Sequence, residues 1–203
     1  MYLTLEEGIY LVRLARYSIQ SYLSDNEFPE VKPAYEKLLK PSGAFVTLKR
    51  YADNSLRGCI GYPEPVLPLY QAVIRAAVAA AFEDPRFPPL SPEELPEVLI
   101  EVSVLTPPER IDTKVSDRKK LPDIVKIGEH GLIIRKGPYS GLLLPQVAVE
   151  YSWDSTEFLN QTCLKAGLWY NCWLELDTEI YTFSAEIFTE KSPGGEIVRE
   201  EMG

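Results

Sequence analysis

Apolar residues in the first half of the chain recur at two spacings, which separate predicted helices from predicted strands. Helical spacing predicts an amphipathic helix over Leu5–Leu23, with Thr4 and Glu7 at the positions of a capping box. Alternation predicts a half-buried strand over Val98–Leu105. Similar patterns predict a short helix over Ala34–Leu39, a hairpin of Ala44–Tyr51 with Leu56–Tyr62, an Ala-rich helix over Leu69–Glu83 and a short helix from Ser91.

The second half repeats this order of elements. The apolar runs Gly131–Arg135 and Gly141–Leu144 predict a second hairpin. Asp154 is placed to cap a helix that ends at Ala166, and Thr178–Phe188 alternates as a final strand. Both halves therefore consist of a hairpin, a helix and a strand, which favours an internal duplication.

The predicted fold class is α+β, with two structural repeats over residues 44–105 and 131–189 that share one mainly antiparallel sheet with flanking helices. No Pro- or Gly-rich linker separates the repeats, so we expect one domain over residues 1–190, which includes the N-terminal helix. The polar segment 191–203 is expected to be a flexible tail.

Composition narrows the class of protein. The 203 residues are 45% hydrophobic and carry a formal net charge of -9, with Arg118–Lys120 as the longest basic cluster. Such a surface repels nucleic acid, so nucleic-acid binding is the least favoured function. We see no secretory signal and no apolar run long enough to span a membrane, which predicts a cytoplasmic location. Few Asn and Gln residues and 17 prolines hint at a thermophilic source.

Cysteine and histidine usage argues against several metal sites. The three cysteines, Cys59, Cys163 and Cys172, are widely spaced and form no CxxC pair, which suits neither a disulfide framework nor structural zinc. His130 is the only histidine, so a multi-histidine site is excluded, whereas a site of oxygen ligands is not. We therefore predict no metal site and no bound cofactor.

The segment LRGCIGY, Leu56–Tyr62, is the strongest candidate for a functional site. As a strand it would place Arg57, Cys59 and Gly61 on one face, with Arg57 and Cys59 about 7 Å apart. A guanidinium there would favour the thiolate. Gly58 and Gly61 weaken a strand and indicate a bulge or the close approach of a ligand. The alternatives for Cys59 are a buried structural thiol, a binding role and, least favoured, a nucleophile.

Five segments together resemble one family, in the same order and over nearly the whole chain. The chain is similar to the AMMECR-type domain, named after the chromosomal region linked to Alport syndrome, midface hypoplasia and elliptocytosis. The resemblance implies a duplicated α+β fold around a curved, barrel-like sheet and a cleft that holds the Arg-Gly-Cys-Ile-Gly run. It also implies Memo-type or radical S-adenosylmethionine proteins as partners. The segments are LRGCIGY, EDPRFPPL (Glu83–Leu90), IEVSVLTPPE (Ile100–Glu109), HGLIIRKGPYSGLLLPQVAVEYSWD (His130–Asp154) and EIYTFSAEIF (Glu179–Phe188).

Four further residues are candidates for the same cleft. His130 matches the His-Gly pair of the family and is a candidate base for Cys59, although a surface or capping histidine is the favoured alternative. Gln146 and Glu150 lie one helical turn apart and are candidate ligand contacts or ordinary surface residues. Arg86 follows Asp84 in a proline-framed loop, where a local turn-stabilising pair is favoured over ligand binding.

Two functions of equal weight follow from these residues. The first is a cleft that binds a small molecule or a modified residue, with thiol chemistry at Cys59 assisted by Arg57 and His130. The second is a non-catalytic adaptor that presents the same cleft to a protein partner. The sequence does not decide between an enzyme and a binding protein.

Overall fold

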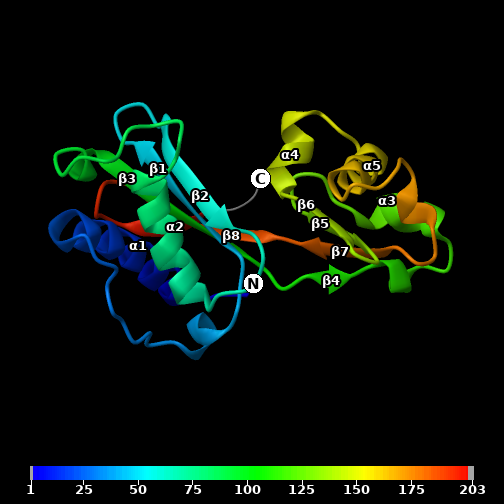
Figure 1. Cartoon of the computed structure of the whole chain (residues 1–203), viewed down its shortest axis with the longest axis horizontal. Helices are drawn as coiled ribbons and strands as arrows, with labels where there is room; N and C mark the ends of the chain where they lie inside the picture. The colour runs from blue at the N-terminus through cyan, green and yellow to red at the C-terminus, as the bar shows by residue number, and fades with distance from the viewer. Residues whose placement is uncertain (1, 201–203) are drawn as a thin grey trace. The chain divides into compact units, whose positions relative to one another are not determined.

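The chain folds into two compact units in a computed structural model that describes residues 2–200 (Figure 1). The first unit contains the described residues up to Leu105 and those from Glu186 onward, and the second spans Thr106–Ala185. Within residues 2–200, no helix combines the length and the apolar composition that crossing a membrane requires.

The first unit is a five-stranded sheet whose strand order is β2-β1-β3-β8-β9, with β1 antiparallel to both neighbours and β8 antiparallel to β9. The helices α1 and α2 pack against each other and against β1–β3 (Figure 1). Its elements are α1 (Leu5–Asp25), the 3-10 turns η1 (Glu36–Leu39) and η2 (Leu95–Glu97), β1 (Ala44–Arg50), β2 (Leu56–Tyr62), α2 (Leu69–Phe82), β3 (Val98–Leu105), β8 (Ala185–Glu190) and β9 (Ile197–Glu200).

Local sequence signals explain the helices of this unit. The capping box before α1 is formed, because Thr4 Oγ1 accepts from the Glu7 N–H at 3.1 Å and Glu7 Oε2 accepts from the Thr4 N–H at 2.8 Å. Small side chains along α2 are almost all buried, which lets this helix lie close to the sheet. The core combines them with alternate strand residues, among them Val46, Leu48, Ile100 and Val102.

The second unit is a four-stranded sheet whose strand order is β4-β7-β5-β6, with antiparallel pairs throughout. The helix α5 packs on β5 and β6, and Phe158, Leu132 and Ile180 belong to its buried core. Its elements are β4 (Glu109–Arg110), η3 (Asp112–Lys114), η4 (Arg118–Lys120), α3 (Leu121–Ile124), β5 (Gly131–Lys136), β6 (Tyr139–Leu143), α4 (Pro145–Glu150), α5 (Ser155–Lys165), η5 (Cys172–Leu174) and β7 (Glu179–Phe183).

Two expectations about the fold need correction. A single sheet shared by both repeats is wrong, because the strands form two sheets and neither is a closed barrel. The predicted strand Thr178–Phe188 is two strands, β7 and β8, which separate at Ser184 and join different sheets. In the segment predicted to be a flexible tail, Ile197–Glu200 forms β9 and pairs with β8, and the flexibility of the segment stays a prediction. Residues 201–203 of that tail lie outside the described residues, and the internal duplication stays a prediction.

Candidate functional site

The strand β2 lies at the edge of the five-stranded sheet and contains a bulge at Arg57. Gly58 pairs with Leu48, and Leu56 pairs with the next residue of β1, so Arg57 is the extra residue. The predicted bulge is therefore present. The inner face of β2 at Gly58 is approached closely by the helix α2 of the protein itself. A Cβ at Gly58 would lie 2.1 Å from the Ala80 carbonyl oxygen of that helix.

Cys59 and Gly61 lie opposite Thr47 and Phe45 of β1, as alternation predicts. Thr47 Oγ1 lies 3.3 Å from Cys59 Sγ, and the Cys59 residue is partly exposed. A Cβ on Gly61 would lie 2.2 Å from the Phe45 ring. Cys59 is therefore neither sealed in the core nor fully open, and the adjacent glycine makes room for an aromatic side chain.

Arg57 does not share the environment predicted for it. The residue is 1% exposed, and its Nε and Nη2 atoms donate to the two carboxylate oxygens of Glu94, each at 3.1 Å. Nη2 also donates to the Pro88 carbonyl at 2.8 Å. The prediction that Arg57 and Cys59 project together is wrong, because the bulge breaks the alternation at this residue and the guanidinium binds the segment after α2.

A different arginine, Arg86, accompanies the thiol. Asp84 accepts the Cys59 N–H through Oδ2 at 2.9 Å, and the same carboxylate binds Nε and Nη2 of Arg86 at 3.0 and 2.8 Å. These hydrogen bonds from Arg86 are the main reason that the pKa of Asp84 lies well below its usual value. The pKa of Arg86 is raised, mainly by its hydrogen bonds to Asp84. The Cys59 backbone and the Arg86 guanidinium therefore bind the same carboxylate.

The Asp84 carboxylate connects the candidate site to two elements of the fold, the strand β2 and the end of the helix α2. The Asp84 side chain is 2% exposed, whereas the Arg86 side chain is 55% exposed. The buried carboxylate thus links the edge of β2 to the end of α2, and it holds an accessible cation beside a partly exposed sulfur. The local Asp84–Arg86 pair predicted from the sequence is confirmed. Its bond to Cys59 was missed, because sequence spacing gives no contact between residues 25 apart.

The other predicted site residues belong to the second unit. His130 Nδ1 accepts the Lys126 N–H at 3.2 Å, so this nitrogen closes a local turn, and burial lowers the pKa of the imidazole. Gln146 and Glu150 are both exposed on α4. The pairing of His130 with Cys59, and ligand contacts by Gln146 and Glu150, stay predictions.

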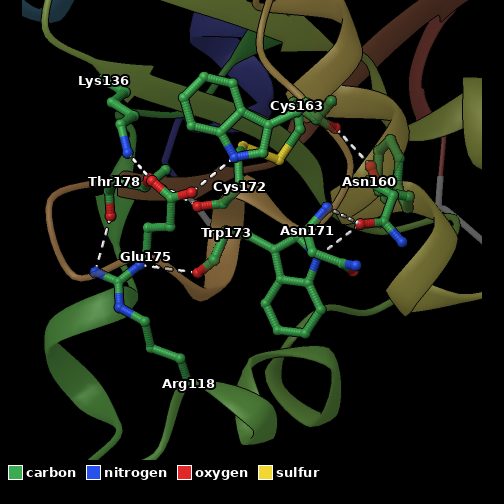
Figure 2. Close-up of a disulfide and its surroundings, with 12 residues drawn as sticks. Arg118, Lys136, Asn160, Cys163, Asn171, Cys172, Trp173, Glu175 and Thr178 are labelled. Atoms are coloured by element: carbon green, nitrogen blue, oxygen red, sulfur yellow. Dashed lines mark hydrogen bonds and ion pairs between the residues drawn. A yellow bond between two sulfur atoms is a disulfide. The ribbon is translucent and has the colours of Figure 1, made fainter.

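The second unit also contains a disulfide that the sequence reasoning excluded. Cys163, near the end of α5, is bonded to Cys172, the first residue of η5, and both are fully buried (Figure 2). Asn171 takes a left-handed conformation that turns the chain back toward the helix. Nearby, Asn160 Oδ1 accepts from the Asn171 N–H and from Trp173 Nε1 at 2.9 and 2.8 Å. A spacing of nine residues without a motif gave no signal for this bond.

The fold and the site define an α+β protein that presents one free, partly exposed thiol beside an arginine on an edge strand. The family model described as AMMECR1 matches residues 12–188, so the chain belongs to the AMMECR1 family. A protein of Methanopyrus kandleri is 51% identical over 201 residues, covering 98% of this chain and 96% of its own length. A protein of Thermococcus gammatolerans is 53% identical over 203 residues, covering 97% of each.

A solved structure shows the same relationship in three dimensions. The crystal structure of an uncharacterized protein from Pyrococcus horikoshii matches with a TM-score of 0.75 and 50% identity. The match covers 96% of this chain and 97% of that one. These comparisons support the family predicted from LRGCIGY and its companion segments, and they attach no activity to it.

Proposed function

We propose that this protein binds a small molecule or a modified residue at the outer face of β2, where Cys59 and Arg86 contact the ligand. The observation that carries the proposal is the Asp84 carboxylate, which binds the Cys59 backbone and the Arg86 side chain together. A buried carboxylate with its lone pairs occupied in this way holds both groups in place before a ligand arrives, which reduces the entropy cost of binding.

The chemistry of the pair favours a ligand with an anionic or strongly polar group. Arg86 is a planar, permanently charged donor that suits carboxylates and phosphates. Cys59 adds a polarizable sulfur that contacts the ligand or, in a second form of the proposal, attacks it as a nucleophile.

Alkylation of Cys59 with a pair of reagents tests the main proposal. Cys163 and Cys172 are bonded to each other, so Cys59 is the only thiol that reacts in the folded, oxidised protein. Its sulfur displaces iodide from anionic iodoacetate or from neutral iodoacetamide. We expect Arg86→Gln to lower the ratio of the iodoacetate rate to the iodoacetamide rate by about fivefold, since an exposed ion pair contributes up to roughly 1 kcal/mol.

Two control variants show whether a change in the ratio of the two alkylation rates comes from the charge of Arg86. Arg86→Lys keeps the positive charge and should keep most of the ratio, and Arg75→Gln removes an exposed arginine of α2 that has no role in the proposal. A ratio that is unchanged in Arg86→Gln would overturn the proposal.

The edge position of β2 favours a second function, a non-catalytic adaptor. An edge strand has one side on which a partner strand can pair. The proposed partners are the Memo-type or radical S-adenosylmethionine proteins that the family resemblance implies. Affinity capture by each purified partner class should survive Cys59→Ala and fail with Arg86→Gln, which removes the positive charge without adding a carboxylate beside buried Asp84. Arg57→Glu is unsuitable here, because it would place a second carboxylate beside Glu94.

A further inference from the structure

A small cavity lies at the Leu56 end of β2, where the β1–β2 hairpin meets η2. It has a volume of about 320 Å³, near the lower end for ligand pockets, and therefore suits a small ligand. Arg50, Tyr51 and Arg57 line one side, and Glu94, Pro96 and Glu97 line the other. The Tyr51 N–H donates to the Glu97 carbonyl at 2.9 Å, so the two sides are joined by the backbone.

The Arg57 guanidinium in this wall lacks one hydrogen bond. Nε and Nη2 bind Glu94 and the Pro88 carbonyl, but buried Nη1 has no partner among residues 2–200. A buried donor without an acceptor is destabilising, and more so when the group is charged, which is why such donors are rare in native proteins. An acceptor oxygen supplied by a ligand would satisfy Nη1.

A second cation and an anion complete the lining. Arg50 and Arg57 both line the cavity, and their guanidinium groups lie 5.9 and 5.7 Å from the centre of the same Phe87 ring. Glu94 is already bound by Arg57 through both oxygens. Among the ion pairs of residues 2–200, neither Arg50 nor Glu97 takes part. The charges left for a ligand are thus one guanidinium and one carboxylate.

We propose that this cavity binds a small zwitterion of the α-amino-acid class. Its carboxylate accepts hydrogen bonds from Arg57 Nη1 and Arg50, its ammonium group faces the Glu97 carboxylate, and its apolar side chain packs on Tyr51 and Pro96. A carboxylate alone would leave Glu97 without a partner and facing an anion, and an amine alone would leave the buried Nη1 unsatisfied. A ligand with both groups matches all of the free charges.

Three probes that share the isopentyl carbon chain test this proposal by ligand-observed NMR titration. L-leucine has both charged groups, 4-methylpentanoate has only the carboxylate, and isoamylamine has only the ammonium. Leucine should bind at least tenfold more tightly than either of the others, because a hydrogen bond to a charged group is lost with each deletion. 4-Methylpentanoate binding as tightly as leucine, or no detectable leucine binding, would overturn the proposal.

Matched variants assign any binding to this cavity. Arg50→Gln and Glu97→Gln should each weaken leucine binding about tenfold, and both change exposed residues, so the fold should be retained. Glu93→Gln changes an exposed neighbour outside the lining and should bind leucine normally. Leucine binding that persists in Arg50→Gln and Glu97→Gln would contradict the proposal. Cys59→Ala should leave leucine binding unchanged, which separates this site from the function proposed for the thiol.

Discussion

The Cys163–Cys172 disulfide allows a quantitative prediction for the second unit. Replacing both cysteines with alanine removes a cross-link between residues nine positions apart. The loop-entropy relation gives about 2.6 kcal/mol for a loop of this length at 25 °C. Both side chains are fully buried, so their truncation adds a packing cost. The double variant should therefore lose at least about 2.6 kcal/mol of unfolding free energy.

Tryptophan fluorescence during urea denaturation measures the loss of unfolding free energy in the second unit, which contains the disulfide. All three tryptophans, Trp153, Trp169 and Trp173, belong to the second unit, so the signal follows its unfolding. The denaturation midpoint should fall at a nearly constant slope, since the surface exposed on unfolding changes little. Adding reductant to the unmodified protein should produce a similar shift if it reduces the bond.

Cys59→Ala is the matched control, because it removes a cysteine from the first unit and breaks no cross-link. Its tryptophan-detected transition should coincide with that of the unmodified protein. A loss below about 1 kcal/mol in the double variant would refute the entropic reasoning for this loop. The same conclusion would follow if free thiols at positions 163 and 172 were found in protein that keeps full stability.

Three further predictions concern the first unit. Gly58→Ala places a Cβ 2.1 Å from the Ala80 carbonyl oxygen and should cost about 2–3 kcal/mol in urea denaturation; a neutral result would contradict the close packing of α2 on β2. Glu94→Gln removes the counterion of buried Arg57 and should cost about 2 kcal/mol by the same assay, whereas an unchanged midpoint would mean that this ion pair contributes nothing. The pKa of Asp84 is lowered on folding, so its stabilisation is present above the unfolded value of about 3.9 and is lost as the pH falls from there toward the folded pKa. Asp84→Asn should therefore lose less stability than the unmodified protein between pH 4 and roughly pH 2, by at most about 1.4 kcal/mol per pH unit; parallel curves would show that Asp84 is not the group responsible.

Local patterns were sufficient to predict most individual elements. The bounds of β2 and β3 agree with the predicted strands, and α1, α2 and α5 begin where the capping and periodicity signals place them. These signals act over a few residues, so they are visible in the sequence. The family was also predicted correctly, because its motifs are spread over the whole chain.

The same local patterns did not predict which residues far apart in the sequence come into contact. Alternation continues through Ser184, and it therefore concealed the point where the chain leaves one sheet and enters another. At Arg57, one inserted residue breaks the alternation, so its guanidinium binds Glu94, and Cys59 is instead linked to Arg86 through Asp84. Cys163 and Cys172 become neighbours only because the chain reverses after α5. Each difference arises where the backbone departs from a regular element.

A crystal structure of the protein after carboxymethylation by iodoacetate tests the account of the thiol most directly. The new carboxylate on Cys59 stands in for the anionic group of a ligand. We predict that it lies within hydrogen-bond distance of the Arg86 guanidinium, about 2.7–3.0 Å, while Asp84 continues to accept the Cys59 N–H. A carboxymethyl group directed away from Arg86, or a Cys59 that stays unmodified in the folded protein, would contradict the account.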